Sequence, residues 1–194
     1  MPGADAAPMT IDTGKLRRSA NQLLPAPIVI TRVTETAPGF DARYSAISRT
    51  YSYCVLNRPY QSPFRGRFVY YHPGRLDLDL LAAAASLIRG RHDFTAFTPT
   101  VTEHNSFERG ITVSEWRREG DLLIYRISAA GFLRNMVRVL VGTMLEIGRG
   151  YRPLDELPEL LNGAGRSAAG ETAPPQGLCL EEVEYPPTVL KSAF

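Results

Sequence analysis

The spacing of hydrophobic and polar positions predicts a chain of short strands and amphipathic helices. Residues 132–147 place their apolar side chains three and four positions apart, which is typical of a helix with one buried face. Alternation of apolar and polar residues predicts strands, and the turn at 118–121 indicates an antiparallel hairpin. The expected strands are Ile28–Val33, Arg49–Asn57, Ile111–Trp116, Leu122–Ala129 and Leu178–Tyr185. Two further helices are expected over Leu76–Ile88 and Pro153–Leu161.

The order of these elements predicts an α+β fold. Strands joined in hairpins, with long helices between them, favour an antiparallel or mixed sheet flanked by helices over a regular alternation of strand and helix. Residues 58–67 are expected to form a loop, because prolines and a glycine interrupt them, and this loop carries three arginines. Residues 1–14 are expected to be a weakly specified lead-in, and the sequence contains no internal repeat of fixed period.

The composition is that of a soluble globular protein, with 44% hydrophobic and 22% charged residues. The longest apolar stretch, Phe132–Ile147, is interrupted by two arginines and an asparagine, so no transmembrane helix is expected. The first residues do not have the pattern of a secretory signal. Cys54 and Cys179 lie inside apolar patterns and are expected to be reduced core thiols of a cytoplasmic protein.

Positive charge is concentrated in the first part of the chain. The net charge is +2, but residues 1–150 carry 19 basic and 13 acidic residues, whereas residues 151–194 carry 3 and 7. Twenty of the 22 basic residues are arginine, whose planar guanidinium suits phosphate contacts and stacking on bases. A nucleic-acid partner is therefore permitted, although a genome that favours arginine, alanine, glycine and proline would explain the same counts.

Familiar catalytic and metal-binding motifs are absent from the sequence. The three histidines and two cysteines lack metal-ligand spacing, and there is no phosphate-binding loop or hydrolase nucleophile elbow. His92 and Asp93 could contain a general base, but beside two phenylalanines they are more typical of a loop anchored on the core.

The chemically distinctive segment is Phe40–Tyr53, in which arginines and tyrosines are interleaved. On a strand, Arg49, Tyr51 and Tyr53 would share one face. Together with Arg43, they could contact phosphates and stack on an unpaired base. The alternative is a half-buried sheet face with tyrosine hydroxyls at its rim.

A second cluster lies on the amphipathic helix, where Arg134 and Arg138 are four residues apart and share a face. Arg138 borders the apolar stripe, a position where arginine is often a surface residue with a buried stem. It becomes functional if a carboxylate lies beside it in a cleft. The sequence pattern alone leaves both interpretations open.

Several separated blocks of the sequence resemble, in the family's order, the tRNA pseudouridine synthase A family over residues 15–187. They are NQLLPAPIVI, FDARYSAISRTYSY, GRHDFTAF, FLRNMVRVLVGTMLEIGRG and TAPPQGLCLEEVEYP. The resemblance implies a pseudouridine-synthase-type sheet and an isomerase that converts uridine to pseudouridine at positions 38–40 of the tRNA anticodon stem-loop. It also implies tRNA as the partner, a homodimer, and chemistry that needs neither metal nor cofactor.

The same resemblance assigns roles to individual residues. Tyr51 would pack against the target uracil, which has to be flipped out of its stack before the glycosidic bond can react. Arg138 would form an ion pair with the catalytic aspartate, and Leu178 would line the uracil pocket. Arg49 and Arg43 are expected to bind the substrate.

The sequence departs from the family pattern at the nucleophile. The family's aspartate lies in a Gly-Arg-Thr-Asp-Ala-Gly-Val-His segment upstream of the Asn-x-x-Leu-Pro block, and the 194 residues contain no such segment. Asp5 lacks these neighbours and is not expected to replace it. We therefore expect an N-terminally truncated member, in which 15–70 is a remnant of the catalytic N-terminal half, 71–187 the C-terminal half and 188–194 a tail. The alternatives are a non-catalytic RNA-binding module and an inactive gene fragment.

Overall fold

The computed structural model describes residues 11–101 and 105–189, which fall into two compact units. The larger unit is Ala46–Glu184, and the smaller comprises the described residues up to Ser45 and from Tyr185 on. The boundaries expected from the family's two halves lie elsewhere in the chain and stay a prediction.

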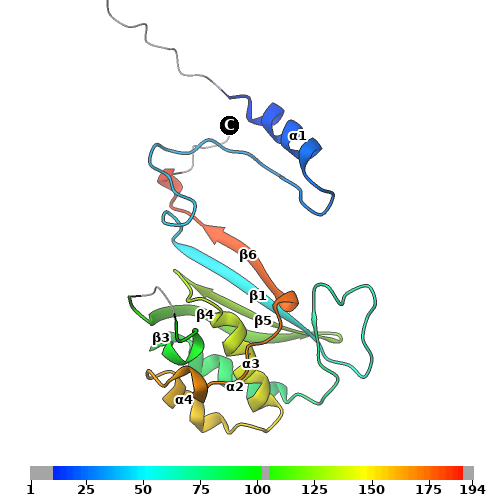
Figure 1. Cartoon of the computed structure of the whole chain (residues 1–194), viewed down its shortest axis with the longest axis vertical. Helices are drawn as coiled ribbons and strands as arrows, with labels where there is room; N and C mark the ends of the chain where they lie inside the picture. The colour runs from blue at the N-terminus through cyan, green and yellow to red at the C-terminus, as the bar shows by residue number, and fades with distance from the viewer. Residues whose placement is uncertain (1–10, 102–104, 190–194) are drawn as a thin grey trace, which may run out of the picture. The chain divides into compact units, whose positions relative to one another are not determined.

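The larger unit is built on a six-stranded mixed sheet (Figure 1). Its strands are β1 (Ser48–Leu56), β2 (Tyr70–Tyr71), β3 (Gly90–Asp93), β4 (Glu108–Glu119), β5 (Leu122–Ala129) and β6 (Leu178–Glu184). The order along the sheet is β2-β1-β5-β4-β3, and β6 pairs with β1. The short β2 runs parallel to β1, whereas every other named pair is antiparallel. Together with the helices that flank it, this sheet confirms the α+β class.

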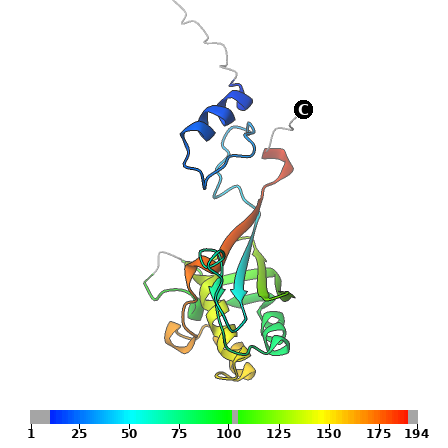
Figure 2. The same cartoon turned by 90° about the vertical axis from the view of Figure 1, so that its right-hand side faces the viewer.

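Helices α2 (Leu78–Ile88), α3 (Met136–Gly148) and α4 (Leu157–Leu160) pack on one face of this sheet (Figure 1). The central helix is α3, in which ten residues are buried. A view from the side shows β1 and β6 running together as an antiparallel pair (Figure 2). The core therefore lies between these helices and the face of the sheet that they cover, to which β1, β4 and β5 contribute buried residues.

The hairpin predicted between the two middle strands is confirmed. Glu119 of β4 pairs with Leu122 of β5, so the connection is the two-residue turn Gly120–Asp121. Gly120 adopts a φ of 58°, which glycine reaches without the steric cost of a side chain. Both strands exist where they were expected, but β4 is longer than predicted at each end.

The helix predicted from Phe132 begins later, at Met136. The reason is Asn135, whose φ of 60° is left-handed and cannot belong to a right-handed helix. Asparagine tolerates this conformation better than most residues with a side chain. The apolar pattern over residues 132–135 is still buried in part, but in an irregular segment that leads into the helix.

The strand predicted at Ile28–Val33 does not form, which makes that prediction wrong. In the smaller unit these residues follow an unpredicted helix, α1 (Thr13–Leu23), which the side chain of Asp12 caps. The side-chain amide of Asn21 bonds both backbone groups of Ile30, donating to its carbonyl at 2.9 Å and accepting from its N–H at 2.8 Å. An alternating pattern is not sufficient for a strand, because a strand also needs a backbone partner along its edge.

The segment His92–Phe97 forms the end of β3 and a short 3₁₀ turn, Thr95–Phe97. The Asp93 carboxylate accepts hydrogen bonds from the backbone and hydroxyl of Thr95, and His92 contacts the backbone carbonyl of Arg89. Phe94 and Phe97 are fully buried. The segment is therefore anchored on the core as expected, but His92 and Asp93 lie in strand β3 and not in a loop, because both pair with β4.

Candidate active site

Tyr51 and Tyr53 lie two residues apart on β1 and point toward the helices. The ring of Tyr51 packs edge-on against Phe132, with ring centroids 5.2 Å apart. Tyr53 is fully buried, and its hydroxyl donates to the carbonyl of Pro174 at 2.6 Å. Burial raises the pKa of Tyr53 far above its usual value. Tyr53 is thus a core residue, whereas Tyr51 stays half-buried at the edge of the core.

Arg138 lies in the first turn of α3, half-buried, and contacts one residue at two points. Its Nε donates to the carbonyl of Ala173 at 2.7 Å, and the N–H of Ala173 donates to the carbonyl of Arg138 at 3.1 Å. A longer bond of 3.4 Å joins its Nη1 to the side-chain oxygen of Asn135. The positive charge of Arg138 also partly offsets the effect of burial on the pKa of Tyr53.

No carboxylate of the described residues lies within ion-pair distance of Arg138. Its guanidinium is therefore held by a backbone carbonyl and an amide oxygen, both neutral groups. Chemically, the arrangement offers a fixed positive charge beside an aromatic ring, which can orient a carboxylate or another anion.

Residues 171–174, which we call the strap, cross α3 and carry the partners of both Arg138 and Tyr53. Gly142 makes this crossing possible, because a Cβ at that position would lie 1.8 Å from the backbone oxygen of Glu171. Thr143 holds Gly170, the residue directly before the strap, because the Thr143 hydroxyl accepts a hydrogen bond from the N–H of Gly170 at 3.0 Å. The backbone that holds Arg138 is thus itself clamped to the helix that carries Arg138.

Leu178 begins β6 and lies directly opposite Tyr53 of β1, while Leu180 lies opposite Tyr51. Residues opposite each other on paired strands point to the same face, so Leu178 and Tyr53 share the face under the helices. Leu178 is partly buried against the core, whereas Cys179 next to it is exposed and Cys54 on β1 is only half-buried, so the expectation that both cysteines are core residues is wrong. The structure therefore brings Tyr51 and Leu178 to one face of the sheet, and the adjacent strap residues Ala173 and Pro174 bond Arg138 and Tyr53.

The two arginines expected to bind substrate are placed differently. Arg49 lies on β1, and its Nη1 donates to the carbonyl of Ala130. Arg43 belongs to the smaller unit, where its guanidinium lies 5.5 Å from the centre of the Tyr44 ring. Asp5 lies outside the described residues.

Sequence reasoning missed the residues that support the site. Phe132 and Asn135 precede the helix, and Ala173 and Pro174 belong to an irregular strap. The only available signal was the asparagine in front of the helix, a residue type that favours left-handed backbone. Every residue has a backbone carbonyl, so the sequence of side chains does not indicate which carbonyl will accept a hydrogen bond from Arg138 or Tyr53.

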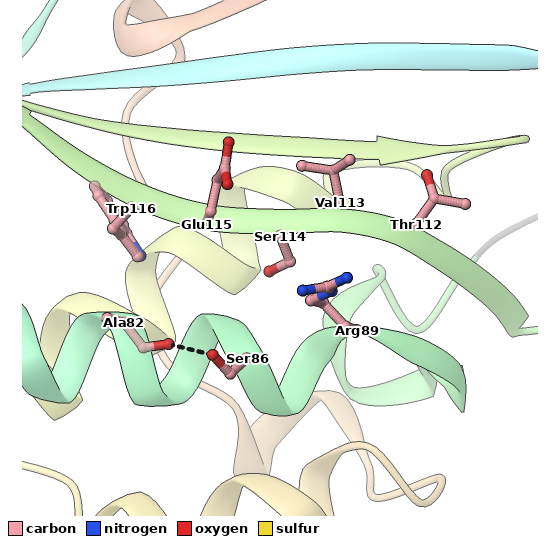
Figure 3. Close-up of a pocket in the computed structure, with 8 residues that line it drawn as sticks. All are labelled: Ala82, Ser86, Arg89, Thr112, Val113, Ser114, Glu115 and Trp116. Carbon is pink, nitrogen blue, oxygen red and sulfur yellow. Dashed lines mark hydrogen bonds between the residues drawn. The ribbon is translucent and has the colours of Figure 1, made fainter.

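A separate hollow of about 230 Å³ lies between α2 and β4 (Figure 3). Arg89 points into it from the end of α2, and Ser114 faces it from β4. Ser86, on its wall, donates to the carbonyl of Ala82 within the helix at 2.9 Å. None of the predicted site residues lines this hollow. Within the described ranges, no group of three possible metal ligands occurs, and no helix is long and apolar enough to cross a bilayer.

The sequence is also similar to known proteins. A sequence profile described as tRNA pseudouridine synthase matches residues 84–186. The tRNA pseudouridine synthase A of Syntrophotalea carbinolica is 38% identical over 180 residues, which cover 93% of this chain and 71% of that protein. The enzyme of the same name from Bacillus pumilus is 39% identical, covering 92% and 72%. The chain belongs to the tRNA pseudouridine synthase family.

Proposed function

We propose that this chain acts on tRNA as part of a pseudouridine synthase, at uridines 38–40 of the anticodon stem-loop. In this isomerisation the bond from ribose C1′ to uracil N1 breaks, and C1′ then joins C5, whose hydrogen leaves as a proton. No atom is gained or lost between uridine and its isomer apart from exchange of that proton. Family membership supports the reaction, and the site geometry supports the roles of individual residues.

The observation that carries the proposal is the fixed guanidinium of Arg138. Its Nε is occupied by Ala173 at 2.7 Å, which leaves the outer nitrogens able to bind a carboxylate in a fixed orientation. Tyr51 offers a half-buried ring against which a flipped uracil can stack, and Leu178 offers an apolar wall on the same face. Flipping costs a few kcal/mol, which contacts of this kind can offset.

The nucleophilic aspartate of the family pattern is not among the 194 residues. We therefore expect this polypeptide, tested by itself, to bind RNA without turnover. A second candidate function is a non-catalytic tRNA-binding module, which would need the arginines and Tyr51 but no carboxylate beside Arg138. Family membership also supports a homodimer and a cytoplasmic location.

Release of tritium from tRNA labelled at uracil C5 distinguishes the two functions. The 194-residue chain should release none. A chimaera that adds the family's Gly-Arg-Thr-Asp-Ala-Gly-Val-His segment, with the chain that flanks it in a relative, should release tritium. Arg138→Ala in that chimaera should lower turnover at least a hundredfold and leave tRNA affinity nearly unchanged. Turnover by the unextended chain that Asp5→Ala abolishes would contradict this proposal.

A further inference from the structure

The segment Asn57–Phe68 joins β1 to β2 as a wide loop that extends past the end of β1 (Figure 1). It belongs to an unusual stretch of sequence: six arginines and no acidic residue occur between Asp41 and Asp77. Three of these arginines and three aromatic residues lie within the loop itself. The loop therefore combines positive charge with flat rings.

Hydrogen bonds order this loop from within. The N–H of Arg65 donates to the hydroxyl of Ser62 at 3.3 Å, and Ser62 is buried. The N–H of Gly66 donates to the carbonyl of Ser62 at 3.2 Å, and the N–H of Phe68 donates to the carbonyl of Arg65 at 2.8 Å. The turn at 62–68 thus has a defined backbone.

Three contacts stabilise the base of the loop. Arg58 forms an ion pair with Asp121 at 3.2 Å, and its guanidinium lies 4.4 Å from the centre of the Tyr60 ring. The hydroxyl of Tyr71 donates to the carbonyl of Pro59 at 2.8 Å. Arg58 and Tyr60 therefore serve the loop's own structure, which separates them from the residues at its tip.

The tip presents two phenylalanines to solvent, Phe64 with 90% and Phe68 with 71% of its side-chain surface exposed. Arg65 and Arg67 lie between them, also exposed, and neither has an ion-pair partner among the described residues. Single exposed apolar residues are common. Here, however, two aromatic rings flank two arginines without ion-pair partners in an ordered turn, which matches the chemistry of single-stranded nucleic-acid binding.

We propose that the tip of this loop binds an unpaired stretch of RNA, with Phe64 and Phe68 stacking on bases and Arg65 and Arg67 contacting phosphates. The inference rests on the proposed function, because tRNA supplies the unpaired bases. The strand from Tyr51 to Leu56 spans about 17 Å. When one uridine of an unpaired RNA loop lies at Tyr51, its neighbouring nucleotides can therefore extend along β1 toward the tip of the protein loop.

Two RNA probes test the proposal: an anticodon stem-loop hairpin, and a blunt RNA duplex with the same number of phosphates. Phe64→Ala and Phe68→Ala should each weaken hairpin binding about tenfold, without changing its salt dependence or the binding of the duplex. Phe64→Leu keeps the apolar volume but loses the flat ring, so it should bind as weakly as the alanine variant. Tyr151→Ala removes an exposed ring at another place, after α3, and should bind both probes normally.

The arginines give the complementary result. Arg65→Gln combined with Arg67→Gln should lower the salt slope of hairpin binding by about 1.4, because each phosphate contact to a single strand contributes about 0.7. The melting temperature of every loop variant should equal that of the wild type, since all four side chains are exposed.

Several results would overturn the inference. Wild-type hairpin affinity in both phenylalanine variants would remove the stacking role and leave the proposed function intact. Equal losses on hairpin and duplex would show that the rings do not distinguish unpaired bases. Self-association that Phe64→Ala abolishes would identify the tip as a protein interface. A wild-type chain that binds neither probe would refute the inference and the proposed function together. If the loop variants lower hairpin affinity but Tyr51→Ala does not, the loop inference stands and only the proposed site at Tyr51 is refuted.

Discussion

Arg138 and Ala173 bond each other in both directions, side chain to backbone and backbone to backbone. The arginine Nε lies 2.7 Å from the carbonyl oxygen of Ala173, and the Ala173 N–H lies 3.1 Å from the carbonyl oxygen of Arg138. Ala173 is buried, so its carbonyl depends on this donor for satisfaction. The residue assigned to the chemistry is therefore also part of the packing between α3 and the strap.

Arg138→Ala should consequently destabilise the 194-residue chain, even though it removes a charge that has no ion-pair partner among the described residues. Loss of a charge-assisted hydrogen bond to a buried carbonyl costs about 2 kcal/mol. Thermal melts and urea titrations should both report the loss. Arg118→Ala is the matched control, because that arginine is exposed on β4 and has no ion-pair partner among the described residues. An unchanged melting temperature for Arg138→Ala would mean that water replaces the guanidinium without cost.

Gly142→Ala should destabilise the chain more than any exposed substitution. The added Cβ would lie 1.8 Å from the Glu171 oxygen, so the strap would have to move away from α3. This movement would break the Arg138 and Thr143 contacts together, at a cost of about 3 kcal/mol or more. Gly165→Ala is the control: a Cβ added there would meet nothing within 4 Å, and the φ of −70° suits any residue. Equal melting temperatures for the two variants would contradict the prediction.

The strands and helices of the larger unit could mostly be predicted from the sequence, because their patterns reflect burial that the fold then provides. Residues 28–33 show the limit of this reasoning. Their alternation is as regular as that of β1, but β1 has backbone partners on both sides, whereas Asn21 alone bonds the backbone of Ile30. Strand pairing requires two segments, and the hydrophobic pattern of one segment does not show whether a second segment lies beside it.

The candidate site shows the same division. Tyr51, Leu178 and Arg138 could be selected from their motifs, and the structure places Tyr51 and Leu178 on one face of the sheet and bonds Arg138 to the strap. Ala173 could not be selected, since it acts through its backbone across 35 positions of sequence. The start of α3 depended on a single left-handed residue, Asn135, inside an otherwise helical pattern. The roles in binding and catalysis stay predictions.

The two buried tyrosines, Tyr53 and Tyr125, should make the chain sensitive to alkali. Burial raises the pKa of both in the folded state, so their neutral forms are favoured there. In the unfolded chain tyrosine ionises near pH 10, so stability is complete below that pH and is lost progressively above it. Tyr53→Phe should flatten the decline in melting temperature above about pH 10.

The same variant should be less stable at neutral pH, by about 1 kcal/mol, because Pro174 loses its hydroxyl donor. Tyr44→Phe removes an exposed tyrosine and serves as the control, since both buried rings remain. An alkaline decline as steep in Tyr53→Phe as in the wild type would show that Tyr53 does not contribute to it.

His72 should set the acid limit of stability in a different way. The ring is buried, its Nδ1 accepts from the N–H of Gly74 at 3.2 Å, and Nε2 has no hydrogen-bond partner among the described residues. Burial first, and the positive charge of Arg149 second, lower the pKa of His72 in the folded state. Protonation would also turn Nδ1 into a donor facing the Gly74 N–H. The folded state therefore binds a proton less readily than the unfolded chain, in which histidine titrates near pH 6.5.

Stability should accordingly fall as the pH drops below about 6.5, and continue to fall until the lowered pKa of the folded state is reached. His72→Asn should make this decline shallower, because an asparagine side-chain oxygen can accept from Gly74 as Nδ1 does but does not titrate. Melting temperatures at intervals between about pH 5 and 7.5 measure the slope. His92→Asn is the matched control, and it should keep the wild-type slope because His72 remains. A wild-type slope in His72→Asn would place the acid sensitivity elsewhere in the chain.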